Sequence, residues 1–255
     1  MTVVGIAGAP EWAEEVARLL RERNAEPVFY TDRASYVARL VDEGVALILV
    51  AGADGQWRFW VTTPKSSPAT RRIPVVLMTE DAQQRDDALH SGANLVLAAG
   101  ELVEALPMLL NELARVPDAA LLAELERQCG EPLPPEAVEA VRRFNAGEFY
   151  KQHDLFEALW MHEPGAVRQL YQGVLQVGIA YFQITRGNGR GALKMLLRSI
   201  QWLALLPDVC QGINIAQLRA DAAQVRAELE RVGEDGLDQF DQRLLKPVQR
   251  VQEAK

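Results

Sequence analysis

The sequence lacks the features of membrane-spanning, secreted and disulfide-rich proteins. None of its apolar runs approaches the roughly 18–20 residues that a membrane helix needs. Its start, MTVVGIAGAP, has neither the basic stretch nor the apolar core of a secretory signal. Its two cysteines, Cys129 and Cys210, are too few for a disulfide framework or a structural zinc site, and we interpret them as ordinary structural thiols. We therefore expect a soluble, cytoplasmic protein with no membrane partner.

Positive charge is also scarce. The 255 residues contain 27 Lys and Arg against 35 Asp and Glu, which gives a net charge of -8. Basic residues adjoin one another only in two pairs, Arg71-Arg72 and Arg142-Arg143. Binding to nucleic acid requires a basic surface, so we expect no nucleic-acid partner. The hydrophobic fraction of 49% and the charged fraction of 24% are typical of a globular protein.

The first 116 residues alternate short apolar runs with amphipathic stretches. The apolar runs predict five strands, at 3–7, 27–30, 45–50, 74–78 and 94–97. The amphipathic stretches predict helices at 11–23, 35–43, 81–91 and 101–115. Strands that alternate with helices form a parallel sheet with helices on both faces. Residues 1–116 are therefore expected to form an α/β domain with a doubly wound, five-stranded parallel sheet.

Three aromatic residues crowd the stretch after the third predicted strand. Trp57, Phe59 and Trp60 precede a segment that we interpret as a polar loop, at 62–70. The aromatic side chains either pack beneath the sheet or form an exposed patch for a partner or for the second domain.

Prolines separate this half of the chain from the rest. Pro117, Pro132, Pro134 and Pro135 place a linker at 117–134, partly helical over 119–129. From residue 135 onward the pattern is helical and does not return to strands. Helices are predicted at 135–145, 148–161, 165–186, 190–206 and 214–232. Residues 135–255 are therefore expected to form an all-α helical bundle.

The first half resembles the receiver domain of response regulators. The resemblance rests on the order of elements and on two segments, PATRRIPVVLMT at 68–79 and SGANLVL at 91–97. It implies a CheY-like fold for residues 1–116. In receivers, an aspartate at the end of the third strand accepts a phosphoryl group. Acidic residues after the first strand hold magnesium, and a lysine at the end of the fifth strand offsets the developing charge.

Most of these phosphorylation residues are missing here. By position, the acidic pair falls on Ala7 and Gly8, the phosphoryl acceptor on Ala51 and the lysine on Ala99. Receivers also have a serine or threonine at the end of the fourth strand, and this residue alone is retained, as Thr79. The resemblance therefore implies a pseudo-receiver that is not phosphorylated.

One acidic residue offers an alternative acceptor. Asp54 lies three residues beyond the end of the third predicted strand. It would be a displaced acceptor without a cation site or a lysine beside it.

The second half resembles the domain-of-unknown-function family 309, a small all-α domain without a settled activity. The match lies within 144–196 and includes the spacing His-x-x-x-Glu-x-x-Trp and the turn Gly-Asn-x-x-Gly-Ala. The matching residues are Phe144, Asn145, Gly147, Tyr150, His153, Glu157, Trp160, Arg168, Gln172, Gly173, Gly187, Asn188, Gly191 and Ala192. A second histidine of the family pattern is replaced by Gln183.

Polar side chains recur at helical spacing within this match. His153 and Glu157 are four residues apart, hence on one helix face, and Trp160 continues that face. A histidine and a carboxylate so placed can share a metal ion, or the carboxylate can orient the histidine as a general base. On the next predicted helix a polar row recurs every fourth residue, at Arg168, Gln172 and Gln176. We expect Arg168 to be the ion partner of Glu157.

Three interpretations of this face remain open. The polar side chains form a buried structural network, or they line a pocket for a ligand or peptide beside Trp160, with Asn145 and Asn188 as further polar candidates. Alternatively, His153 and Glu157 serve a metal-dependent or acid–base enzyme. Two protein ligands make a poor zinc site, since catalytic zinc normally has three. We therefore expect no metal and no cofactor.

These patterns together favour a non-catalytic signalling or scaffold protein of the two-component type. A phosphorylation-incompetent, receiver-like domain would be coupled to a helical domain that binds a ligand or a partner. The alternative is a hydrolase-type enzyme that uses His153 and Glu157. Receivers commonly associate through one face, so the resemblance also implies a homodimer. Either domain could bind a further protein partner.

Overall fold

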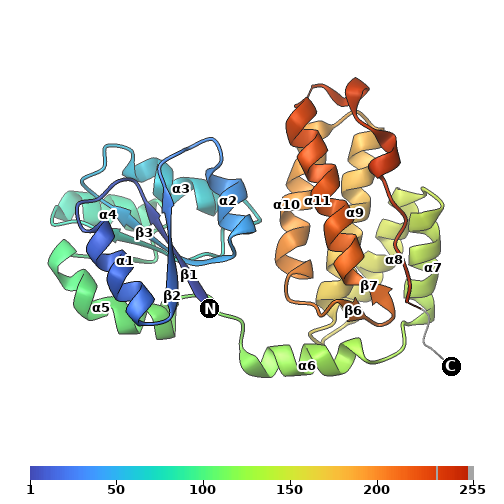
Figure 1. The fold of residues 1–255 in the computed structure, drawn as a ribbon, viewed down its shortest axis with the longest axis horizontal. Helices are drawn as coiled ribbons and strands as arrows, with labels where there is room; N and C mark the ends of the chain where they lie inside the picture. Colours follow the sequence, from blue (N-terminus) through green and yellow to red (C-terminus); the bar gives the residue numbers. More distant parts are fainter. Residues whose placement is uncertain (234, 252–255) are drawn as a thin grey trace. The chain divides into compact units, whose positions relative to one another are not determined.

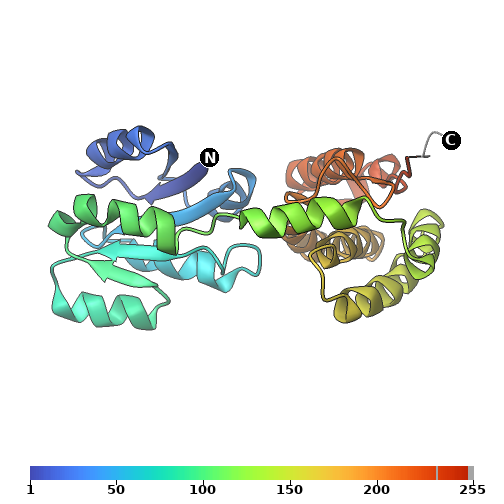
Figure 2. The same cartoon turned by 90° about the horizontal axis from the view of Figure 1, so that it is seen from below.

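The computed structural model describes residues 1–233 and 235–251, which fall into two compact units (Figure 1). The first unit, Met1–Val116, is built on a sheet, and the second begins at Pro117 and is helical. Both units are also visible from below in Figure 2. No helix within the described part of the chain is long and apolar enough to cross a membrane.

The sheet of the first unit has five parallel strands in the order β2–β1–β3–β4–β5. Every residue of β3 is buried, as expected of a central strand that helices cover on both faces. The predicted doubly wound, CheY-like fold is confirmed. The strands are β1 (Thr2–Ala7), β2 (Ala25–Tyr30), β3 (Val45–Ala51), β4 (Val75–Met78) and β5 (Leu95–Leu97).

Helices cover the two faces of this sheet in unequal numbers. One apolar cluster joins the sheet to α1 and α5, and a second cluster on the other face joins it to α2, α3 and α4. A short 3-10 turn (Ala99–Glu101) precedes α5, and a π-helical turn (Leu109–Leu113) follows it. The helices are α1 (Ala13–Glu22), α2 (Tyr36–Asp42), α3 (Trp57–Ser66), α4 (Ala82–His90) and α5 (Leu102–Met108).

Helix α3 replaces the first part of the polar loop that the sequence predicts, so that prediction is wrong. Pro64 lies inside α3 and has no N–H to donate to the Trp60 carbonyl. The Tyr36 hydroxyl donates to that carbonyl instead, at 3.2 Å. Trp60 is buried, and its ring packs edge to face against Tyr36 with 4.9 Å between the ring centroids. Burial of the aromatic side chains therefore stabilises a helix whose local sequence disfavours it.

Helix α9 is the central helix of the second unit. Twelve of its 18 residues are buried, and it packs between α8 and α10. Gly178 lets α8 approach α9 closely, because a Cβ at this position would collide with the side-chain amide of Gln152 on α8. Two short 3-10 turns follow the last helix, at Leu237–Gln239 and Gln242–Leu244. The helices are α6 (Ala119–Cys129), α7 (Pro135–Asn145), α8 (Phe149–His162), α9 (Arg168–Thr185), α10 (Gly189–Leu203) and α11 (Ile215–Val232).

The predicted helical second unit is confirmed, but two of its details differ from what the sequence predicts. A small antiparallel hairpin, β6 (Val209–Cys210) and β7 (Ile213–Asn214), interrupts the helices. Its two-residue turn is formed by Gln211 and Gly212, both at positive φ, as tight hairpins require. Cys129 and Cys210 form a disulfide and are not separate thiols. The fold brings these cysteines together across a sequence separation of 81, which neither local pattern nor spacing reveals.

Candidate functional site

The carboxyl edge of the sheet is the position at which the receiver resemblance places phosphorylation. Here β3 ends at Ala51, which is followed by Gly52, and the side chain of Gln84 from α4 reaches across to this point. Gln84 Nε2 donates to the Gly52 carbonyl at 2.7 Å, and the Thr79 hydroxyl donates to Gln84 Oε1. The Asp81 N–H donates to the Thr79 hydroxyl oxygen at 3.1 Å. Neutral hydrogen bonds thus join the ends of β3 and β4 to α4.

Asp54 also lies at this edge, but its carboxylate is engaged. Trp60 Nε1 donates to one carboxylate oxygen at 3.0 Å, and the Gln56 N–H donates to the other at 2.7 Å. Gly8 follows β1 at a positive φ of 84°, and a Cβ there would collide with the Asp54 carboxylate. Asp54 therefore occupies the space above the end of β1. No cluster of three or more His, Cys, Asp or Glu within the described residues is placed to hold a metal ion.

In the second unit, His153 and Glu157 share one side of α8, as their spacing predicts. The His153 side chain is 26% exposed, and its Nδ1 lies 3.2 Å from a carboxylate oxygen of Asp154. The ring of Tyr150 is stacked on the His153 ring, with 6.0 Å between the ring centroids. The centroid of the Phe182 ring, from α9, lies 5.6 Å from that of Tyr150. His153 thus belongs to a partly exposed aromatic surface.

The expected ion pair between Arg168 and Glu157 is not formed. The Arg168 guanidinium lies over the Trp160 ring, 5.7 Å from its centroid. Across the described ranges, no hydrogen bond or ion pair joins any two of His153, Glu157, Arg168 and Gln172. Arg168 is exposed at the start of α9, where attraction to an aromatic face replaces the carboxylate partner.

The buried polar side chains of the second unit lie elsewhere. Gln172 and Gln176 are buried in α9, and Gln176 Oε1 accepts no hydrogen bond from any described residue. Gln152 is fully buried, and its Nε2 donates to the Leu175 carbonyl at 3.5 Å. The sequence reasoning missed Gln152. Its position four residues before the buried Phe156 was the available signal.

The two asparagines among the predicted polar residues bind backbone groups. Asn188 is the N-cap of α10, where its Oδ1 accepts from the Gly191 N–H at 2.9 Å. Asn188 also donates to Gln183 Oε1 at 2.8 Å. Asn145 pairs with the backbone of Val248 through two hydrogen bonds, at 2.9 and 2.7 Å. Both side chains therefore stabilise the local fold.

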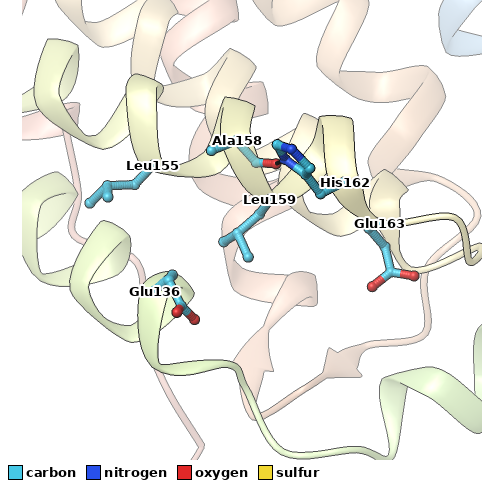
Figure 3. A pocket seen from close by; sticks show the side chains of 6 residues that line it. All are labelled: Glu136, Leu155, Ala158, Leu159, His162 and Glu163. Carbon is cyan, nitrogen blue, oxygen red and sulfur yellow. Dashed lines mark hydrogen bonds between the residues drawn. The ribbon is translucent and has the colours of Figure 1, made fainter.

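A hollow of about 320 Å³ lies beside α8 and was not predicted (Figure 3). Its apolar side chains come from Leu155, Ala158 and Leu159 on successive turns of α8. Glu136 at the start of α7 and Glu163 after α8 add carboxylates, and His162 completes the lining. His162 binds the Ala158 carbonyl through Nδ1 at 2.7 Å. The hollow thus has an apolar side on α8, and it carries one carboxylate from α7 and one that follows α8.

The helical unit matches a known family over part of its length. Residues 137–195 match the family model described as "Domain of unknown function (DUF309)". This segment is a DUF309 domain. It spans α7, α8, α9 and the first turns of α10, so that His153, Glu157, Trp160 and Arg168 all lie inside it.

Two further proteins are similar to parts of the chain. An "Uncharacterized protein" of Aquifex aeolicus (strain VF5) is 27% identical over 88 residues, which cover 34% of this chain and 26% of that protein. The match thus spans about a quarter of that relative. The crystal structure of the Mn(2+)-bound form of response regulator Rcp1 aligns at 18% identity with a TM-score of 0.36. The alignment covers 46% of this chain and 100% of that one.

Proposed function

We propose that the chain is a non-catalytic signalling or scaffold protein of the two-component type. Its receiver-like domain accepts no phosphoryl group, and its DUF309 domain binds a ligand or a protein partner. The observation that carries the proposal is the closed carboxyl edge of the sheet, where Gln84 binds both Gly52 and Thr79.

The chemistry of aspartyl phosphorylation supports the proposal. A carboxylate nucleophile that attacks a phosphodonor needs a divalent cation and a further positive charge to offset the developing negative charge. The third strand ends in Ala51, and both carboxylate oxygens of Asp54 already accept hydrogen bonds from Trp60 and Gln56. The side chain of Gln84, which occupies this edge, is a neutral amide and supplies no positive charge.

The surface of the DUF309 domain supports a binding role. Tyr150 and Met161 on α8 are 58% and 66% exposed, and the hollow lined by Leu155 and Leu159 lies on the same helix. Large exposed apolar side chains are typical of surfaces that bind a ligand or a partner. A homodimer through the receiver-like domain is part of the same proposal, and sedimentation against the monomer mass of 28.3 kDa tests it.

Phosphoryl transfer tests the proposal. The full chain is incubated with magnesium and acetyl phosphate, and intact mass spectrometry follows the addition of a phosphoryl group. A response regulator that is known to be phosphorylated serves as the positive control, and the Asp54→Asn variant is treated in parallel. We expect no adduct on either form of the chain. A stable adduct on the wild-type chain that is lost in Asp54→Asn would refute the proposal.

One observation favours the enzyme as a second candidate. The His153 side chain is 26% exposed, and Glu157 forms no hydrogen bond or ion pair with a described residue, so both groups are open to a ligand. Elemental analysis of the wild-type protein beside His153→Ala separates the two functions. A stoichiometric metal that is lost in the variant would favour a metal-dependent enzyme. Equal, substoichiometric metal in both would argue against it.

A further inference from the structure

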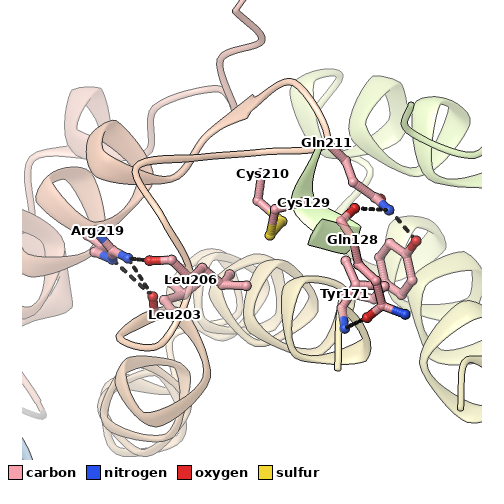
Figure 4. The surroundings of a disulfide bond; sticks show 9 residues. Gln128, Cys129, Tyr171, Leu203, Leu206, Cys210, Gln211 and Arg219 are labelled. Atoms are coloured by element: carbon pink, nitrogen blue, oxygen red, sulfur yellow. Dashed lines mark hydrogen bonds between the residues drawn. A yellow bond between two sulfur atoms is a disulfide. The ribbon is translucent and has the colours of Figure 1, made fainter. Parts of the chain in front are cut away.

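The Cys129–Cys210 disulfide joins the connecting helix to the helical unit (Figure 4). Cys129 is the last residue of α6, and Cys210 belongs to the β6–β7 hairpin. Helix α6 begins two residues after Pro117, the first residue of the second unit, so it carries the connection from the sheet domain. We infer that this disulfide is a reversible redox latch, and that its reduction by a dithiol frees α6 from the helical unit.

Helix α6 is most deeply buried toward its C-terminal end, although Leu121 near its start also packs against the helical core. Its buried residues are Leu125, Gln128 and Cys129, whereas its first turns are largely exposed and Leu122 is 40% exposed. With only 11 residues, α6 is too short to be stable alone in water, because isolated helices below about 12–15 residues are marginal. Its helical state therefore depends on its attachment to the rest of the unit.

The polar contacts of this attachment converge on the disulfide. The Gln211 N–H donates to the Cys129 carbonyl at 2.7 Å, and Tyr171 donates its hydroxyl proton to Gln211 Oε1 at 3.0 Å. Gln128 Oε1 accepts from the Val167 N–H at 2.8 Å. Gln128 precedes Cys129, and Gln211 follows Cys210, so both glutamines adjoin the bridge in the sequence.

One cysteine of the bridge lines a cavity. Cys210 is fully buried, whereas Cys129 is 6% exposed and lines a cavity of about 820 Å³ together with Pro132, Leu133 and Val209. An attacking thiolate must approach the sulfur from outside the protein. Of the two cysteines, Cys129 is therefore the one that we expect a reductant to attack first.

The exchange reaction is complete with a dithiol as the reductant. A thiolate of the dithiol attacks Cys129 Sγ, the bond to Cys210 breaks, and Cys210 leaves as a thiolate that takes up a proton. The second thiol of the reagent then attacks the mixed disulfide and releases Cys129. The protein gains two electrons and two protons, and the dithiol becomes a cyclic disulfide. The two cysteine sulfurs no longer share a bond and must move apart to non-bonded contact.

Amide hydrogen exchange tests the latch on the full chain. The protein is measured as isolated, after reduction with dithiothreitol, and after reoxidation with oxidised glutathione, whose disulfide is reduced to two thiols in the exchange. Alkylation followed by mass spectrometry counts the thiols. We expect two alkylated thiols only after reduction. Exchange in peptides that cover residues 119–129 should then rise severalfold and return after reoxidation, while α9 remains protected. The Cys129→Ser/Cys210→Ser double variant should exchange like the reduced protein, and dithiothreitol should not change its exchange rates.

Three results would overturn the inference. Unchanged exchange in α6 after confirmed reduction would show that the disulfide does not control this helix. An increase of exchange in α9 as large as that in α6 would show that the disulfide stabilises the whole unit and does not act on α6 in particular. Two alkylated thiols in the untreated protein would show that the bridge does not form.

Discussion

The side-chain amide of Asn145 and the backbone of Val248 form two hydrogen bonds across 103 positions of sequence. Asn145 Nδ2 donates to the Val248 carbonyl at 2.9 Å, and the Val248 N–H donates to Asn145 Oδ1 at 2.7 Å. Asn145 ends α7 inside the DUF309 match, whereas Val248 lies far beyond it. The core of the matched domain therefore includes chain outside the matched residues, and Val248 itself is buried.

Replacement of Asn145 should destabilise the helical unit. Asn145→Ala leaves two backbone groups of Val248 without partners, and we expect the free energy of unfolding to fall by about 1–3 kcal/mol. Asn145→Asp keeps the acceptor for the Val248 N–H but loses the donor to the Val248 carbonyl, so it should also lower the free energy of unfolding. Urea unfolding followed by circular dichroism measures both variants. An unchanged midpoint for Asn145→Ala would show that the pair contributes nothing.

Loss of the disulfide should lower stability without unfolding the chain. The bridge closes a loop with a sequence separation of 81, and removal of a native disulfide typically costs about 2–5 kcal/mol. The Cys129→Ser/Cys210→Ser variant should therefore unfold at lower urea than the oxidised wild type. Wild-type protein in dithiothreitol should match the variant. Coinciding curves for oxidised and reduced protein would contradict this expectation.

The carboxyl edge of the sheet should depend on Gln84. Gln84→Ala removes the hydrogen bonds to Gly52 and Thr79, and we expect a loss of about 1–2 kcal/mol in the stability of the first unit. Gln83→Ala is the matched control, because the Gln83 side chain is exposed on the same helix and its amide makes a long hydrogen bond of 3.4 Å to Asp87. Thermal unfolding compares the two. Equal melting temperatures would show that Gln84 does not close this edge.

Alkaline pH should destabilise the first unit through Tyr36. Burial raises the pKa of Tyr36 above its ordinary value of 10.0, so the folded state keeps the phenol protonated. This contribution is fully present below about pH 10 and is lost as the pH rises through the folded pKa. Melting temperatures from pH 7 to about 11 should fall less steeply for Tyr36→Phe than for wild type. Tyr150→Phe, at an exposed position, should follow the wild type; identical slopes for all three would contradict this account.

The fold could be predicted from the sequence because its signals are local. The apolar runs of β1 and β3 and the helical spacing of α7 and α11 reflect burial of each element by itself. Helix α3 was missed because its second half is polar and contains Pro64, so that its local sequence favours a loop. The hydroxyl that replaces the missing donor of Pro64 comes from Tyr36.

The candidate site could be predicted only in part. The shared face of His153 and Glu157 follows from helical geometry within α8. Contacts between helices depend on how each helix is rotated in the bundle, which spacing does not specify. For this reason Arg168 lies over Trp160 and not against Glu157. The Cys129–Cys210 pair depends on tertiary structure in the same way.

The central claim is that the receiver-like domain offers no phosphoryl site. Beryllofluoride mimics a phosphoryl group on an aspartate, and it needs the same carboxylate and divalent cation. The direct measurement is a titration of the ¹⁵N-labelled chain with magnesium and beryllofluoride, observed at the amides of Gly8, Gly52 and Thr79. We expect no saturable shifts at these amides. Saturable shifts there that disappear in Asp54→Asn would contradict the central claim.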